Sequence, residues 1–120
     1  MTDINQVARH YIELWNERAP GRRREMLAQN WTADATYVDP LMSGDGHDGV
    51  DALISGVQQR FPESCFKLIG EPNGFGDNLR FSWGLGPDGE SPIKGTDFAV
   101  LKDVRIKSIT GFLDQVPAGA

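Results

Sequence analysis

The chain has 120 residues, of which 39% are hydrophobic and 24% are charged. This composition fits one domain, over residues 1–120, that can bury its own core, and it excludes a disordered or fibrous protein. Twelve basic against 17 acidic residues give a net charge of −5, which disfavours nucleic acid as a partner because phosphate binding needs a basic face. No apolar run approaches about 18 residues, so we expect no membrane partner. The single cysteine, Cys65, and the lack of a secretory pattern in residues 1–6 favour a cytoplasmic location.

Three amphipathic helices are predicted in the first half of the chain. Apolar residues recur at three- and four-residue spacing over residues 3–17 and again over 49–61. A shorter helix with one apolar side is predicted over residues 21–30. Asp48 is expected to cap the third helix. The basic run at 22–24 is interpreted as a solvated helix start, not as an anion site.

The strands are predicted mainly in the second half of the chain. A short strand is expected at residues 35–39, followed by a flexible loop at 43–49. From residue 64 the apolar period changes to two, which predicts antiparallel strands that end near residue 114. Residues 70–95 hold 7 of the 14 glycines, which indicates bends and bulges in long curved strands. Helices followed by antiparallel strands predict an α+β fold.

Several apparent motifs do not support a cofactor or a metal. Residues 84–89 have the glycine spacing of a dinucleotide-binding loop, but Pro87 and the alternating runs on either side indicate a hairpin turn. The acidic loop at 45–51 lacks the ligand order of a calcium site. His10 and His47 are too few for a zinc site of two or three histidines. We therefore expect no cofactor and no metal.

Three of the 11 aspartates lie where strand chemistry disfavours them, while the other eight fit caps, turns and loops. Asp39 and Asp114 end predicted strands, and Asp97 lies inside one, on a face shared with small and apolar residues. Burial would raise the pKa of such a carboxyl above about 3.9. A carboxyl of this kind can donate a hydrogen bond or take a proton from carbon. The alternative is that each is a strand-edge residue that reaches water.

Four segments carry a resemblance to a known family. They are Tyr-Ile-Glu-Leu-Trp-Asn at 11–16, Trp-Thr-Ala-Asp-Ala-Thr-Tyr-Val-Asp-Pro at 31–40, Gly-Val-Asp-Ala-Leu at 49–53 and Gly-Thr-Asp-Phe at 95–98. With the order of elements, they resemble the nuclear transport factor 2-like (NTF2-like) superfamily, and within it the SnoaL-like and ketosteroid isomerase-like proteins. The resemblance covers nearly the whole chain. It implies a cone of three N-terminal helices over a strongly curved antiparallel sheet, enclosing an apolar pocket, commonly in a homodimer.

The resemblance to ketosteroid isomerase also implies a catalytic set. That pattern has a Tyr on the first helix, an Asp-Pro after the first strand and an Asp on a late strand, and Tyr11, Asp39 and Asp97 fall on those positions. Asp39 would then be the general base that removes a proton next to a carbonyl. Tyr11 and protonated Asp97 would donate hydrogen bonds to the enolate oxygen. Tyr11 also lies on the apolar stripe of its helix, where a plain core role is the alternative.

A second resemblance, to limonene epoxide hydrolase-like members, implies a different site. These proteins activate water with two aspartates bridged by an Arg, helped by a Tyr and an Asn. Tyr37, Asp97 and Asp114 fit that pattern, but Gly95 occupies the Arg position and Asp39 the Asn position. Without the Arg, the two carboxylates would repel each other, so this interpretation ranks lower.

Aromatic side chains and one further carboxyl are expected to contact a ligand in the pocket. Trp15 and Trp83 are the favoured contacts, although most aromatics in a domain of this size pack in its core. The expected substrate-binding residues are Trp15, Trp31, Tyr37, Trp83, Phe98, Phe112 and Asp114.

These observations predict a cofactor-free acid–base enzyme that acts on a small, largely apolar carbonyl compound. The superfamily contains isomerases, cyclases and dehydratases, so the fold alone does not fix the reaction. The alternatives are a non-catalytic protein that binds a hydrophobic ligand in the same pocket, an epoxide hydrolase, and a protein-interaction adaptor. A homodimer is expected from the resemblance.

Overall fold

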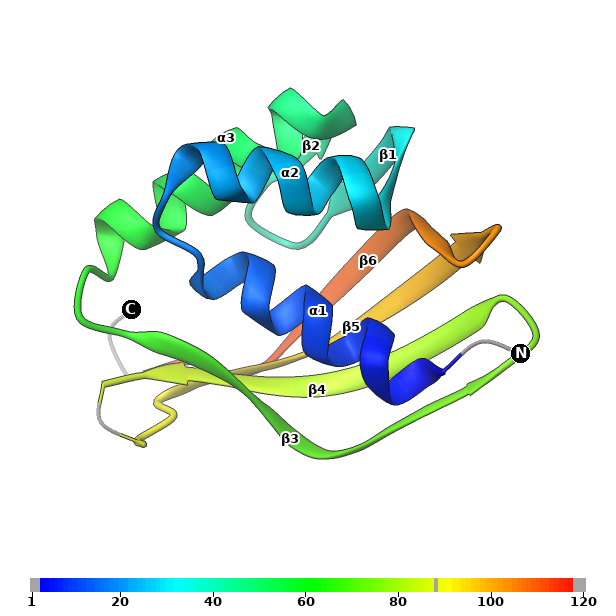
Figure 1. Ribbon diagram of the computed structural model, residues 1–120. Coiled ribbons are helices and arrows are strands. Elements are labelled where there is room, and N and C mark those ends of the chain that lie inside the picture. The colour runs from blue at the N-terminus through cyan, green and yellow to red at the C-terminus, as the bar shows by residue number, and fades with distance from the viewer. Residues whose placement is uncertain (1–2, 88, 118–120) are drawn as a thin grey trace.

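The computed structural model describes residues 3–87 and 89–117, and it contains three helices and six strands (Figure 1). The helices are α1 (Ile4–Asn16), α2 (Pro20–Asn30) and α3 (Gly46–Arg60). The strands are β1 (Trp31–Val38), β2 (Ser43–Asp45), β3 (Cys65–Phe75), β4 (Asn78–Gly86), β5 (Ile93–Lys102) and β6 (Arg105–Gln115). The predicted α+β fold is confirmed.

The six strands form one sheet in the order β2-β1-β6-β5-β4-β3. Strands β3 to β6 form an antiparallel meander, and β2 pairs antiparallel with β1. The exception is the β1–β6 pair, which is parallel and joins the first strand of the chain to the last. This pairing brings the end of β1 beside the middle of β6, whose other neighbour is β5.

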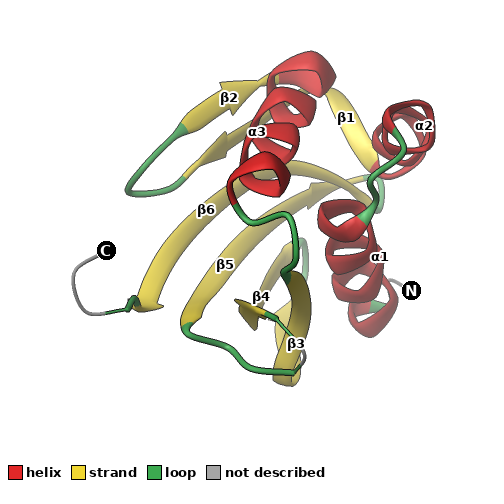
Figure 2. Cartoon of the chain, turned by 90° about the vertical axis from the view of Figure 1, so that its left-hand side faces the viewer, coloured by secondary structure: helices red, strands yellow, loops and turns green. Residues whose placement is uncertain are grey.

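The core lies between the three helices and one face of the curved sheet (Figure 2). The apolar alternation at residues 79–85 explains this, because Leu79, Phe81, Trp83 and Leu85 are all buried on that face. Three register shifts accompany the curvature in this part of the sheet, one in β3 between Ile69 and Asn73 and two in the β5–β6 pair. The expectation of bulges in this part of the chain is confirmed.

The element boundaries differ from the predictions at three points. Pro20 is the first residue of α2, where its missing N–H costs no hydrogen bond. Residues 43–45 form the short strand β2, where a flexible loop was predicted. The helix α3 begins at Gly46, so Asp48 is in its first turn and does not cap it. Asp48 instead pairs with Arg24 at 2.6 Å.

One arginine of the basic run is buried, which corrects the interpretation of that run as solvated. Arg23 is 3% exposed, and its Nε donates to Asp51 Oδ1 at 2.8 Å. Its Nη1 donates to Gln58 Oε1 at 3.1 Å and to the Glu17 carbonyl at 3.2 Å. Gln58 in turn donates to the carbonyls of Glu17 and Trp15 at 2.8 and 3.0 Å. This network joins α2 and α3 to the C-terminal end of α1.

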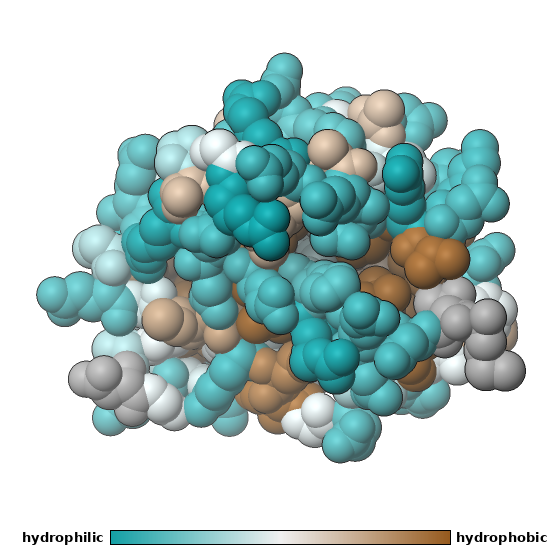
Figure 3. Space-filling view, viewed as in Figure 1, coloured by the Kyte–Doolittle hydropathy of each residue, from teal (hydrophilic) through white to brown (hydrophobic). Residues whose placement is uncertain are grey.

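The surface in Figure 3 is largely hydrophilic, with hydrophobic side chains in small patches. No helix of the described residues is both long and apolar enough to span a membrane.

Candidate functional site

Asp39 lies just beyond the end of β1, in the turn that leads to β2. Its Oδ1 accepts hydrogen bonds from the backbone N–H groups of Leu41 and Met42, at 2.8 and 2.9 Å. Its Oδ2 accepts a hydrogen bond from the hydroxyl of Tyr37 at 2.7 Å. These three donors fix the orientation of the Asp39 carboxyl group.

Asp97 lies in the middle of β5 and is 2% exposed. Its Oδ2 accepts a hydrogen bond from the hydroxyl of Tyr11, while its Oδ1 is buried and has no partner among the described residues. Burial raises the pKa of Asp97 to about 6, an effect that the Tyr11 hydroxyl and the nearby Trp83 indole partly offset. Asp97 therefore changes charge close to neutral pH, and Oδ1 is the carboxyl oxygen that has no hydrogen-bond partner among the described residues.

The side chains of Asp39 and Asp97 both approach Gly111 of β6. Asp97 is the register partner of Gly111 on one side, and on the other side Val38 is paired with Thr110, so Asp39 comes next to Gly111. A Cβ atom placed on Gly111 would lie 2.9 Å from Asp97 Oδ1, 3.1 Å from Asp39 Cβ and 3.6 Å from the Tyr37 hydroxyl. Because Gly111 has no side chain, the side chains of Asp97 and Asp39 can occupy the space beside it.

A cluster of aromatic side chains surrounds the carboxyl groups on the helix side. The ring of Trp15 lies 5.6 Å from that of Tyr37 and 5.5 Å from that of Phe66, which in turn lies 5.3 Å from the ring of Trp83. The Nε1 atoms of Trp15 and Trp83 are buried without a hydrogen-bond partner among the described residues. Trp83 Nε1 lies near the Asp97 carboxyl without completing a hydrogen bond to it. Two free N–H donors are therefore enclosed beside the Tyr11–Asp97 pair.

Both tyrosines of the site are protonated donors. Burial is the largest cause that raises the pKa of Tyr11 and of Tyr37 well above the ordinary value of 10, and the charge of Asp97 adds to it in both cases. Each hydroxyl therefore keeps its proton at neutral pH and donates it to a carboxyl, Tyr11 to Asp97 and Tyr37 to Asp39.

Three of the seven predicted ligand contacts are not in the site. Phe98 and Phe112 are 41% and 56% exposed and alternate with the buried Asp97 and Gly111, so they lie on the outer face of the sheet. Asp114 is also exposed and accepts a hydrogen bond from Thr96 at 2.7 Å. The expectation that these three residues line the pocket is wrong, because strand alternation turns them to the other face.

The other predicted contacts are buried on the helix side of the sheet. Trp15, Tyr37 and Trp83 belong to the aromatic cluster around Asp97. Trp31 is stacked on Tyr11 with ring centres 6.0 Å apart, away from the carboxyl pair. Sequence reasoning missed Gly111 and Phe66. The signal for Gly111 was a glycine inside a strand, which often marks a close approach of other groups.

The donor set does not suit a metal ion. Among residues 3–87 and 89–117, no group of three or more His, Cys, Asp or Glu side chains could hold one. What surrounds the two carboxyl groups is instead hydroxyl and indole donors in an apolar shell, an arrangement suited to proton transfer and to binding an oxygen atom.

The fold is similar to that of two solved structures of low sequence identity. A structure from Kribbella flavida, provisionally described as a ketosteroid isomerase, has a TM-score of 0.71 and 19% identity, and it covers 98% of this chain and 82% of its own. A polyketide cyclase, also provisionally described, from Sinorhizobium meliloti has a TM-score of 0.71 and 15% identity over 88% of this chain and 93% of its own. At this identity the likeness shows the fold alone.

A third structure shows the family. It is provisionally described as an isomerase of the SnoaL-like family from Agrobacterium tumefaciens, is 43% identical and has a TM-score of 0.87 over 91% of this chain and 95% of its own. The chain belongs to the SnoaL-like family. Neither a protein-family model nor a curated protein matches the sequence.

Proposed function

We propose that this protein is a cofactor-free enzyme that removes a proton next to the carbonyl group of a small, largely apolar substrate. The observation that supports this most is the approach of Asp39 and Asp97 to Gly111, where the Asp39 carboxyl accepts three hydrogen bonds and Asp97 is buried with one carboxyl oxygen that has no partner among the described residues. Two carboxyl groups in different surroundings can take different roles in acid–base catalysis.

In the proposed reaction Asp39 is the general base. It takes a proton from the carbon next to the carbonyl, and the C–H electron pair moves into the enolate. The proton on Asp39 then returns to a different carbon in an isomerisation. In a cyclisation the enolate carbon attacks a second carbonyl, whose oxygen takes up the proton from Asp39. In a dehydration the enolate expels a β-hydroxyl group, which takes up that proton and leaves as water. General base catalysis of this kind contributes roughly 10²- to 10⁴-fold.

Asp97 is the proposed partner of the enolate oxygen. When protonated on Oδ1, it donates a hydrogen bond to the oxygen as negative charge develops there, in a site where burial strengthens the interaction. The free indole N–H of Trp83 is a second donor in the same place. Tyr11 is already bonded to Asp97, so its proposed role is to hold the Asp97 carboxyl, and its contact with substrate is indirect.

The epoxide hydrolase alternative has less support. Its second aspartate would be Asp114, which is exposed and bonded to Thr96 on the outer face. Its bridging Arg is replaced by Gly95, and the space where a Cβ of Gly95 would lie is filled by the Trp83 ring at 2.3 Å. The water-activating mechanism requires a cation between two carboxylates, and Gly95 cannot supply it.

Paired substitutions test the proposed reaction on a panel of carbonyl, enone and epoxide compounds. We expect turnover of a carbonyl or enone by the wild type, with Asp39→Asn and Asp97→Asn each lowering kcat by about 10²-fold or more. Asp114→Asn is the matched control and should keep wild-type turnover. Binding of a hydrophobic ligand with no turnover across the panel, and with equal affinity in Asp39→Asn, would instead identify a non-catalytic binding protein.

The pH dependence of turnover separates the two roles that Asp97 could have. If protonated Asp97 is the oxygen donor, kcat/KM should fall about tenfold per pH unit above pH 6, the region of its raised pKa. A rate that rises with pH through 6 would show that ionised Asp97 is the base, and the proposed assignment of roles would then be reversed.

We further propose that the protein is a homodimer and that it acts in the cytoplasm. The exposed Phe98 and Phe112 on the outer face of the sheet support the first proposal, because a monomer seldom leaves neighbouring aromatic rings in water. The second is supported by Cys65, a free and exposed thiol that suits a reducing compartment.

A further inference from the structure

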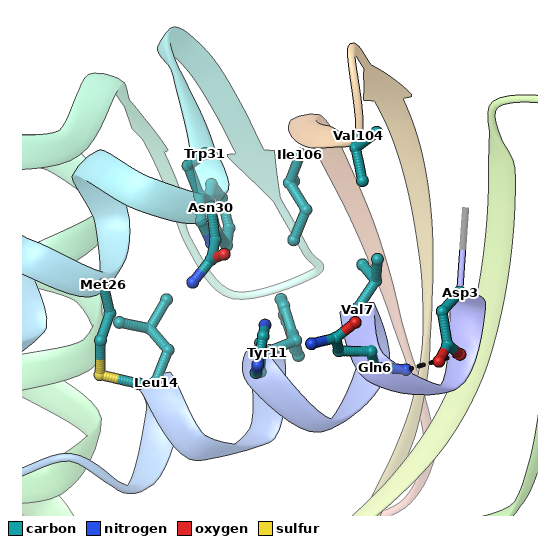
Figure 4. A pocket seen from close by; sticks show the side chains of 11 residues that line it. Asp3, Gln6, Val7, Tyr11, Leu14, Met26, Asn30, Trp31, Val104 and Ile106 are labelled. Atoms are coloured by element: carbon teal, nitrogen blue, oxygen red, sulfur yellow. Dashed lines mark hydrogen bonds between the residues drawn. The ribbon is translucent and has the colours of Figure 1, made fainter. Parts of the chain in front are cut away.

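A cavity of about 200 Å³ lies between α1, the end of α2, the start of β1 and the β5–β6 turn (Figure 4). Its apolar wall consists of Val7, Leu14, Met26, Trp31, Val104 and Ile106. Neither Asp39 nor Asp97 lines it, and of the proposed catalytic set only Tyr11 does. The cavity is therefore distinct from the space over Gly111.

The backbone at the mouth of this cavity is strained. Val104 has φ +70°, in the left-handed region where a β-branched residue is a clear outlier. Asn-Gly is the preferred sequence for a two-residue turn with positive φ at both positions and would adopt it without strain at 103 and 104. The chain instead holds the Val104 side chain, 59% exposed, at the cavity wall. Strain that persists at such a position points to a use for that side chain.

The polar side chains of the cavity indicate what it can bind. Gln6, His10 and Asn30 contribute hydrogen-bonding groups, and no Lys or Arg lines the cavity. One oxygen of the Asp3 carboxyl, Oδ1, accepts from the N–H groups of Asn5 and Gln6 at 3.1 and 3.2 Å. The Asp3 carboxyl and the lack of Lys or Arg among the described lining residues disfavour an anion, whereas a neutral molecule with one polar group would find both donors and acceptors. The volume suits a single ring, and the Trp31 indole offers a flat surface to it.

Tyr11 connects this cavity to the carboxyl pair. Its ring lines the cavity and is stacked on Trp31, while its hydroxyl donates to Asp97. We propose that the cavity is a second binding site, for a neutral single-ring molecule with one hydroxyl or amide group, and that its occupant acts on Asp97 through the Tyr11 side chain. Binding here does not require that the protein be an enzyme.

Titration of the ¹⁵N-labelled protein with p-cresol tests the site without any measurement of turnover. We expect saturable shift changes in the backbone signals of Val7, Trp31 and Val104 and in the indole signal of Trp31, with a dissociation constant on the order of 1 mM. Changes centred on the indole signals of Trp15 and Trp83 would place the ligand at the carboxyl pair and overturn the proposal. So would the absence of saturable changes up to the solubility limit of p-cresol.

Two variants of the cavity wall and one control sharpen the test. Val7→Phe fills the cavity, and Val104→Gly removes part of the wall while tolerating the positive φ of the turn, so it folds even if the first does not. Each should weaken p-cresol binding at least fivefold, and Val116→Phe, which is exposed outside the cavity, should bind as the wild type does. Wild-type affinity in both wall variants would contradict the site.

The link through Tyr11 has its own readout. In the wild type, p-cresol should shift the titration midpoint of the Asp97 carboxyl ¹³C signal. In Tyr11→Phe the ligand should still bind but leave that midpoint unchanged, because the hydroxyl that joins the ring to Asp97 is gone. A midpoint that moves equally in both proteins would show that Tyr11 does not carry the effect.

Discussion

The buried carboxyl of Asp97, the proposed donor to the enolate oxygen, has a cost in stability. An ionised carboxyl in this position loses its water and keeps one oxygen without a partner, so folding favours the protonated form. Its folded pKa of about 6 lies above the ordinary value of 3.8, so the folded state binds more protons than the unfolded state between these two values. Stability therefore falls as pH rises through this window, and above pH 6 the whole cost is present.

Asp97→Asn should remove this cost. The difference of about 2 pKa units corresponds to about 3 kcal/mol, so the variant should become more stable than the wild type by up to about that amount at pH 8. The advantage should shrink as pH falls from 6 towards 4. Urea unfolding of both proteins at pH 4.5, 6 and 8 measures it.

The control for this prediction is Asp114→Asn, since an exposed carboxyl keeps its water on folding. Its stability difference from the wild type should vary little over the same pH range. If the Asp97 and Asp114 variants behaved alike, burial of Asp97 would not be what sets its protonation.

At the scale of single residues, the sequence predicted Asp39 and Asp97 because strands disfavour aspartate. It could not predict that they meet, since this depends on the parallel β1–β6 register that brings residues 39, 97 and 111 together. Phe112 and Asp114 point outward because they alternate with Gly111 along β6. Sequence alone could not predict this, since it does not show which face of β6 is buried.

Among the elements, the three helices are held to one another by a buried polar network centred on Arg23. Its guanidinium joins Asp51 and Gln58 of α3, and with Gln58 it occupies the last carbonyls of α1. These carbonyls would otherwise lack partners at a buried helix end. The network also fixes the backbone of Trp15, whose side chain forms one wall of the aromatic cluster.

Arg23→Met should destabilise the protein by about 3 kcal/mol, because it leaves the buried Asp51 carboxyl with its direct partner removed. Arg22→Met is the matched control. Arg22 pairs only with Glu25 on the surface, and its loss should cost less than about 0.5 kcal/mol. Equal losses in urea unfolding would show that the network adds nothing beyond an exposed ion pair.

Sequence periodicity predicted the helices and the long strands well, because each depends on neighbours within a few residues. It failed for Arg23, whose partner Asp51 lies 28 residues further along the chain. It also failed for β2, a three-residue strand that exists through pairing with β1 and has no apolar alternation of its own. Both errors concern contacts that only the tertiary fold creates.

For the molecule as a whole, the curved sheet has one face covered by helices and one face open (Figure 2). The open face carries Phe98 and Phe112 on β5 and β6, two neighbouring strands in the middle of the sheet. With a net charge of −5, two copies repel each other at long range, so an association between them must depend on apolar contact over a limited area.

Sedimentation equilibrium should therefore show a dimer, and the dimer should weaken as salt is lowered, because less screening strengthens the repulsion between the two copies. Phe112→Glu places a charge in the middle of the open face and should shift the protein to a monomer. Phe75→Glu is the matched control, because Phe75 is 79% exposed at the end of β3, on the edge strand of the sheet. A wild type that sediments as a monomer at high concentration would refute the dimer, and a dimer that Phe112→Glu leaves intact would exclude this face as its interface.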